Sequence, residues 1–136
     1  MQLRTSITIL LFLFTTFCVA QKNSPLVGTW KMISGKTTIK DSTSNNDLTN
    51  VIVLKIVTPT HLSYFAQSVS DSSLLGTFLG RVQMDEKNYK EEIFCASEKG
   101  MIGFIGTFTY TVDGDKWHLV GGGGDMKFDE IWQRVK

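Results

Sequence analysis

The stretch LVGTWKMIS, from Leu26 to Ser34, raises the question that decides the fold. In this stretch Trp30 directly follows Gly28 and Thr29, close to the N-terminal end of the segment that we expect to fold. The residues around Trp30 are too few to cover an indole. A segment from a distant part of the sequence must therefore bury it, and identifying that segment identifies the architecture.

The residues before this stretch have the pattern of a secretory signal peptide. Arg4 provides a positive charge, and an almost unbroken apolar run follows from Ile7 to Phe14. Ala20 then offers a small residue at the cleavage point. We expect residues 1–20 to be a signal peptide and residues 21–136 to be one domain.

Export is the expectation that follows, to a secreted or periplasmic location. The apolar run is too short to span a bilayer comfortably, so a retained membrane anchor is the less favoured alternative. A lipidation signal is less favoured still, because the bulky Phe17 precedes Cys18 where a small residue would be needed. We expect no integral membrane association after cleavage.

The charge balance gives no sign of a polyanionic partner. The chain has 136 residues, so loss of the first 20 leaves 116, and Arg4 is the one charged residue lost, which leaves 13 basic and 13 acidic side chains. Binding of nucleic acid would call for a basic stripe, so we expect no nucleic-acid partner. Cys95 is the one thiol left after Cys18 is removed, so the domain has no internal disulfide and depends on its core.

Between Leu26 and Val135 the sequence is typical of an all-β domain, with short runs of β-branched and aromatic residues between turn residues. The clearest hairpin is FTYTVDGDKWHLV, where Asp113-Gly114 predicts a type I′ turn. Before that turn, strict alternation puts one set of residues on a single face of the strand. This set is Phe104, Gly106, Phe108, Tyr110 and Val112.

The remaining segments fit the same plan. We expect a long mobile loop at Asp41 to Asn50 and a flexible hairpin loop at Gly121 to Asp125, where neither a helix nor a lysine–serine pair follows to make a phosphate site. The segment 87–98 fits both a strand and a helix, and we favour a strand. The total is eight or nine strands and no obvious helix.

That many antiparallel strands in so short a chain most simply close into an up-and-down barrel of about eight strands. Closure brings the first strand beside the last, MKFDEIWQRVK. We expect the indole of Trp30, behind Gly28, to plug one end of the barrel with the guanidinium of Arg134 over its face.

At these residues the chain resembles the lipocalin superfamily, a calycin-type group, through Gly28-Thr29-Trp30 near the start and Arg134 near the end. The segments KIVTPTHLSYF, NYKEEI, GDKWHLVG and DEIWQRVK are similar to a family of small secreted bacterial lipocalin-like proteins of unknown function. The resemblance spans most of residues 21–136 and implies a compact barrel. The chain has no disulfide and no room for the C-terminal helix of animal lipocalins, so the resemblance implies no particular ligand.

The sequence shows no convincing catalytic or metal-binding cluster. His61 and His118 lack ligand-like neighbours, so a hydrogen-bonded strand histidine is a better interpretation of His61 than a haem ligand. Cys95, between Phe94 and Ala96, is best explained as a small buried apolar residue. We expect no metal, no cofactor and no enzyme activity.

A barrel interior is the natural site for a ligand, and alternating positions identify candidates to line it. These are Phe65, Phe78, Phe108, Tyr110 and Trp132, with Glu130 and Arg81 as charged groups. Glu91 also alternates with apolar residues, and Arg81 or Arg134 could pair with these carboxylates.

Two functions remain open from the sequence. One is a binding module that holds a small apolar or amphipathic molecule inside the barrel. The other is an interaction protein with a solid core that contacts a macromolecule through the loops at 41–50 and 67–75. An interior cavity of about 300 Å³ or more would favour the binding module.

Overall fold

The computed structural model of the protein describes residues 24–136, and the proposed signal peptide at 1–20 lies outside them. These residues form nine strands and one short 3₁₀ helix, η1 (Lys99–Met101). The strands are β1 (Gly28–Ile39), β2 (Ser42–Asn45), β3 (Val51–Val57), β4 (His61–Ser68), β5 (Leu74–Met84), β6 (Asn88–Ala96), β7 (Ile105–Asp113), β8 (Lys116–Gly123) and β9 (Met126–Arg134).

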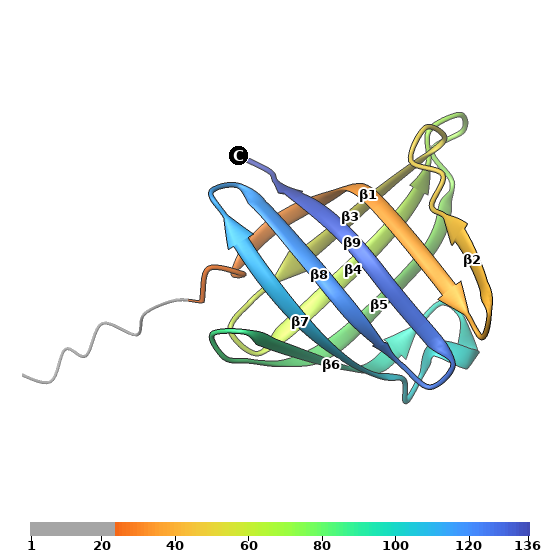
Figure 1. Ribbon diagram of the computed structural model, residues 1–136. Helices are drawn as coiled ribbons and strands as arrows, with labels where there is room; N and C mark the ends of the chain where they lie inside the picture. Colours follow the sequence, from red (N-terminus) through yellow and green to blue (C-terminus); the bar gives the residue numbers. More distant parts are fainter. Residues whose placement is uncertain (1–23) are drawn as a thin grey trace, which may run out of the picture.

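Eight of these strands close into a barrel (Figure 1). Neighbours along the chain pair antiparallel from β3 to β9, and β1 pairs with β3 on one side and with β9 on the other. The all-β, up-and-down barrel expected from the sequence is therefore confirmed. The segment 87–98, which also fits a helix, contains strand β6 as favoured.

The strand β2 lies outside the ring of eight. Its residues pair with the second half of β1, from Lys36 to Ile39, where β1 has already left β3. The prediction that 41–50 is one long loop is therefore wrong in part. All four residues of β2 are exposed and polar, so the strand has no apolar alternation that a sequence could reveal.

Two turns also differ from the prediction in detail. In the β7–β8 hairpin Asp113 pairs with Lys116, so Gly114 and Asp115 are the central residues, and among them only Gly114 has a positive φ. This is the φ pattern of a type II′ turn, with glycine first, and not of type I′.

The run of glycines at 121–124 is mostly strand. Gly121 to Gly123 end β8, and only Gly124 and Asp125 form the turn to β9. A Cβ atom on Gly121 would lie 2.2 Å from the carbonyl oxygen of Thr107, on the neighbouring strand. Glycine is needed here because the backbones of adjacent strands approach too closely for a side chain.

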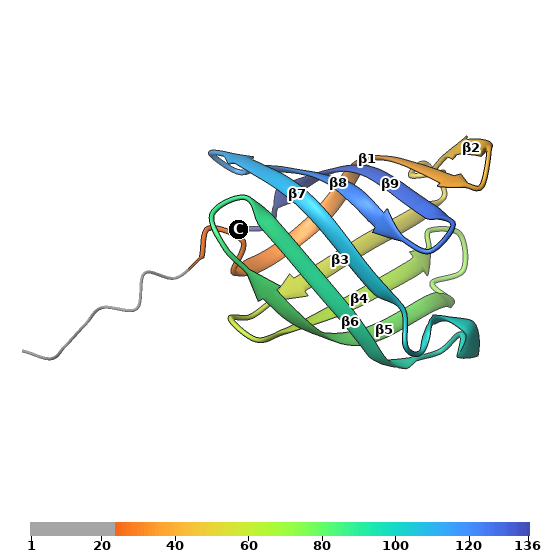
Figure 2. The same ribbon diagram turned by 60° about the horizontal axis from the view of Figure 1, so that its bottom comes forward.

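The core occupies the interior of the barrel, and it is filled mainly at one end. The side chains of Trp30, Trp117, Trp132 and Tyr89 are fully buried there, with edge-to-face contacts such as the one between Trp30 and Trp117, whose ring centroids are 5.4 Å apart. Residues 24–27 and the C-terminus lie at this end, while β2 and η1 lie at the other, as both views show (Figures 1 and 2).

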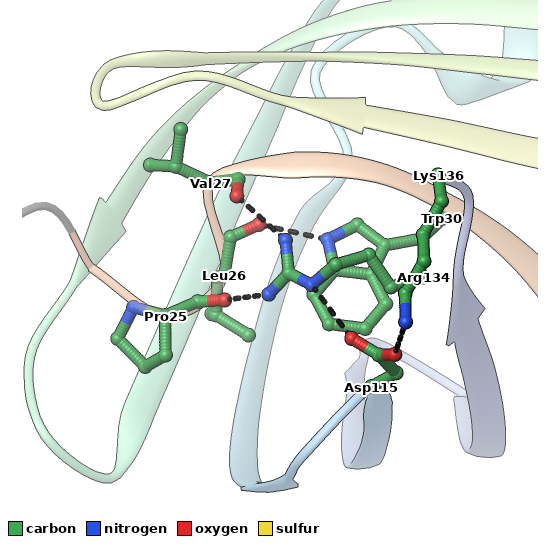
Figure 3. A network of polar contacts seen from close by, with 7 residues as sticks. All are labelled: Pro25, Leu26, Val27, Trp30, Asp115, Arg134 and Lys136. Carbon is green, nitrogen blue, oxygen red and sulfur yellow. Dashed lines mark hydrogen bonds and ion pairs between the residues drawn. The ribbon is translucent and has the colours of Figure 1, made fainter.

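The end that holds the termini is closed by Trp30 and Arg134. The two residues are directly paired between β1 and β9, and the guanidinium carbon lies 4.1 Å from the indole centroid (Figure 3). Gly28 leaves the room for this contact, because a Cβ there would lie 2.5 Å from Nη1 of Arg134. The partner that buries Trp30 is therefore the last strand, together with the rest of the core.

Hydrogen bonds tie the chain before β1 across the same end. Arg134 donates from Nη1 to the carbonyl of Val27 at 3.0 Å and from Nη2 to that of Pro25 at 2.6 Å. Trp30 donates from Nε1 to the carbonyl of Leu26 at 2.8 Å, and the Leu26 side chain is fully buried. This end of the barrel is thus covered by Leu26 and its backbone (Figure 3).

Candidate ligand cavity

A charged layer lies above the aromatic core, and Lys55 is at its centre. In the sequence VIVLKIV, strict alternation points Val53, Lys55 and Val57 inward, so the lysine must enter the barrel with its apolar neighbours. Its Nζ lies 4.8 Å from the ring centroid of Trp132 and 5.4 Å from that of Trp117. The ammonium therefore rests on aromatic faces, whose negative charge stabilises a cation.

Two carboxylates from other strands complete the layer. Glu91 on β6 lies with Oε2 3.5 Å from Nζ of Lys55, and Glu130 on β9 accepts a hydrogen bond from Nε1 of Trp132 at 3.0 Å. Lys55, Glu91 and Glu130 are the buried charged residues of the described chain. The layer thus holds one ammonium and two carboxyl groups.

The surroundings of Glu130 oppose its ionisation. Burial is the largest cause and raises the pKa of this carboxyl above its ordinary value. The positive charge of Lys55 acts in the opposite direction, and the negative charge of Glu91 adds to the increase.

Two tyrosines border the same layer. Burial, aided by the charges of Glu130 and Glu91, raises the pKa of Tyr64 to about 12, and burial also raises the pKa of Tyr89. Both hydroxyls are therefore neutral at physiological pH. Within residues 24–136, the hydroxyl of Tyr89, Oε2 of Glu91 and Nε1 of Trp117 are buried without a hydrogen-bond partner.

A cavity of about 470 Å³ lies between this layer and the end of the barrel that carries β2 and η1. Lys55, Tyr64, Glu91 and Glu130 line its inner part. Its walls are mostly apolar and come from β1, β3, β4, β5, β7 and β9: Met32, Val53, Ala66, Phe78, Phe108 and Phe128. Phe78 is held flat against Tyr64, with ring centroids 4.4 Å apart.

The mouth of the cavity is formed by the connections at that end. Leu48, from the segment after β2, lines it together with Leu75 at the start of β5 and Met101 of η1. Leu75 is 55% exposed. Asn46, Asp47, Ser97 and Glu98 also line the cavity at this end, so an apolar molecule entering the barrel would pass a mixed rim and then mostly apolar walls down to the charged layer.

The structure places three of the predicted site residues on the cavity wall: Phe78, Phe108 and Glu130. Trp132 and Tyr110 also point into the barrel but lie below the cavity, in the core. Trp132 supports the charged layer from beneath, and the hydroxyl of Tyr110 donates to the carbonyl of Asp85 at the closed end.

The predicted interior positions of Phe65 and Arg81 are wrong. Phe65 is 37% exposed, because the inward residues of β4 are its neighbours Tyr64 and Ala66. Arg81 lies between the buried Gly80 and Val82 and therefore faces outward, where it covers the ring of Phe94 at 4.9 Å. The predicted arginine partner of Glu91 or Glu130 is also wrong, because the cation beside Glu91 is Lys55.

Lys55 is the main residue that the sequence analysis did not identify. The signal was available, because Lys55 interrupts an otherwise apolar alternation in β3 in the same way that Glu91 does in β6. Tyr64 and Ala66 are not among the predicted interior residues, because an inward Phe65 requires both of its neighbours to face outward.

Cys95 is exposed, which contradicts its predicted burial. The cause is an irregularity in the pairing of β5 with β6: Leu79 pairs with Cys95 and Gly80 with Ile93, so Phe94 is an extra residue. His61 is also exposed, and its Nδ1 lies 2.8 Å from the hydroxyl of Thr60.

Residues 24–136 contain no group of three or more His, Cys, Asp or Glu side chains placed to hold a metal ion. They also contain no helix with the length and apolar character needed to cross a membrane.

Comparison with known proteins shows the fold. No protein-family model and no curated protein matches the chain. A solved lipocalin-like protein from Bacteroides uniformis is similar with a TM-score of 0.52 and 15% identity, over 81% of this chain and 98% of that chain. A solved structure described as REP1-NXSQ fatty acid transporter is similar at a TM-score of 0.42 and 10% identity, over 82% of this chain and 96% of that chain. The first of these similarities shows that the chain has the lipocalin-like barrel fold.

Proposed function

We propose that the protein is an exported binding protein that holds a small apolar or amphipathic molecule in its barrel. The observation that carries the proposal is the cavity of about 470 Å³, which falls in the size range of about 300–1,000 Å³ typical of small-molecule sites. The alternative, an interaction protein with a solid core, requires the interior to be filled, and it is filled only at the closed end.

The arrangement of side chains supports the same function. Apolar walls lead from the rim to a layer with a few polar groups, which is the usual composition of a pocket that binds an apolar molecule and orients it by one polar end. Burial of apolar ligand surface contributes about 25 cal/mol per Å². The walls thus provide affinity and the charged layer provides orientation.

The test is binding of N-phenyl-1-naphthylamine, an apolar dye that fluoresces more strongly away from water. We expect saturable binding to the wild-type protein. Ala66→Phe should abolish or strongly weaken it, because Ala66 lines the cavity and a phenyl group there fills it. Gln67→Phe is the matched control, since Gln67 is the next residue of β4 and is exposed.

Equal binding to both variants would contradict a site inside the barrel. Absence of binding to the wild-type protein would favour the interaction protein. Export is tested separately by N-terminal sequencing of the protein recovered outside the cytoplasm, which we expect to begin at Gln21. A sequence beginning at Met1, or a lipid on Cys18, would contradict the signal peptide.

A further inference from the structure

The charged layer also indicates which polar group the ligand carries. This inference rests on the proposed function. We propose that the ligand of the cavity is an amphiphile whose polar end is a cation, a protonated amine, and that Glu130 and Glu91 receive it. The proposal concerns the chemical class of the ligand and follows from the balance of buried charges.

The first argument is the count of charges. Two carboxyl groups and one ammonium group are buried at the inner end of the cavity, so the layer has a formal charge of −1 when all three are ionised. Charges in an interior are costly unless they are paired. With Glu130 ionised, a cationic ligand group would bring the total to zero and would stabilise the charged form that burial disfavours, whereas an anionic group would bring the total to −2.

The second argument is that Lys55 is already provided with partners. Its Nζ lies 3.5 Å from Oε2 of Glu91 and within 5.8 Å of the ring centroids of Trp132, Trp117 and Tyr89. A ligand carboxylate would have to compete with Glu91 for this ammonium and would lie beside Glu130. The layer therefore has one more carboxyl group than it has cations.

The third argument is that the carboxylate acceptors are incompletely satisfied. Oε2 of Glu91 lies 3.5 Å from Nζ of Lys55 but accepts no hydrogen bond, and Glu91 lines the cavity and is 95% buried. Glu130 also lines the cavity, is 92% buried, and uses Oε2 to accept from Trp132. A primary ammonium has three donors and could satisfy acceptors on both carboxylates.

The test compares three probes with the same chain: decylamine, decanol and decanoate, titrated into the protein by calorimetry at neutral pH. We expect decylamine to bind at least about tenfold more tightly than decanol, because hydrogen bonds between an ammonium and a carboxylate are stronger than those of a neutral hydroxyl. Decanoate should bind more weakly than decanol.

Variants locate the effect. Glu130→Gln should reduce the preference for decylamine over decanol at least about fivefold, because it removes the charge and keeps an acceptor for Trp132. Asp129→Asn is the matched control: it removes a carboxylate from the next residue of β9, which is exposed and pairs with His118 on the outer surface. That variant should keep the wild-type order of the three probes.

The two proposals fail in different ways. If decanol and decanoate bind as tightly as decylamine, or if Asp129→Asn changes the preference as much as Glu130→Gln, the cationic group is wrong and the binding function stands. If none of the three probes binds and the dye does not bind either, the binding function itself is wrong, and the inference fails with it.

Discussion

Lys55 is the residue on which the interior of this protein depends. Lys55 is 97% buried, so its positive charge must be compensated inside the barrel. One carboxylate and three aromatic rings, contributed by three other strands, provide this compensation. Removal of one partner of a buried pair leaves the other without compensation, which is usually more costly than removal of both. The same residue sets the boundary between the packed core and the cavity.

Replacement of Lys55 should therefore be strongly destabilising and partly reversible by a second change. We expect Lys55→Met to lower the free energy of unfolding by about 3–5 kcal/mol, as measured by urea denaturation. The double variant Lys55→Met/Glu91→Gln should recover a substantial part of that loss, because Glu91 is then uncharged. A single variant as stable as the wild type would show that the buried pair makes no net contribution.

Trp30 and Arg134 allow a second prediction for individual residues. Trp30→Ala should cost about 3–5 kcal/mol through lost burial, and Arg134→Ala should cost less, because its cation–π contact contributes about 0.5–2 kcal/mol. A double-mutant cycle should give a coupling energy in the latter range. Lys136→Ala is the control, since Lys136 is 80% exposed and its ion pair is with Asp115, and it should not couple to Trp30. Strictly additive effects of Trp30 and Arg134 would contradict the stacked arrangement.

At the scale of the elements, the barrel strands were predictable and the departures from regular pairing were not. Alternation alone identifies β7, where Gly106, Phe108 and Tyr110 all face inward. Alternation gives no signal in β2, because all of its residues are exposed. It also gives the wrong face after Phe94, where the strand register changes. For the candidate site, alternation placed Phe78, Phe108 and Glu130 correctly, but on β4 it gives two possible faces, and the choice of Phe65 was the wrong one.

The close approach of β8 to β7 at Gly121 can be tested by substitution. Gly121→Ala should destabilise the protein by about 3 kcal/mol in urea denaturation, because its Cβ would meet the backbone of Thr107, which cannot move without displacing β7. The φ of Gly121, +154°, adds strain for any other residue. Gly76→Ala is the control, since it lies in β5 with no atom within 4 Å of its Cβ position, and we expect little change. Equal effects would mean that β8 does not approach β7 this closely.

The whole molecule is a barrel divided across its length. The end with the termini is filled by three tryptophans and covered by Leu26, whereas the end with β2 and η1 leaves a cavity of about 470 Å³. The charged layer lies at the boundary, where its upper side faces the cavity and its lower side rests on rings. The closed end thus stabilises the barrel, and the open end leaves room for the ligand that we propose.

The pH dependence of stability is a property of the whole molecule, because groups with opposite tendencies contribute to it. At the turns, the pKa of exposed Asp85 is lowered by hydrogen bonds from the backbone of Lys87 and from Asn88, so its contribution is present at neutral pH and is lost on acidification. Glu130 acts in the opposite sense, because burial raises its pKa. The folded state keeps the Glu130 proton where the unfolded chain has lost it.

This difference can be isolated by comparison of the wild type with Glu130→Gln, which stays neutral at every pH. For a group whose folded pKa is raised, the stabilisation is complete below the unfolded pKa, near 4.5 for glutamate, and is lost as the pH rises through the folded pKa. We therefore expect the stability of the wild type relative to Glu130→Gln, measured by urea denaturation from about pH 4 to pH 8, to decrease as the pH increases. The contributions of Asp85 and the other turn carboxylates cancel in this comparison. Lys55, Glu91 and Asp129 are the charged groups that act on Glu130, and they are unchanged in the variant. A relative stability that increases with pH would show that the attraction of Lys55 outweighs the cost of burying the Glu130 charge.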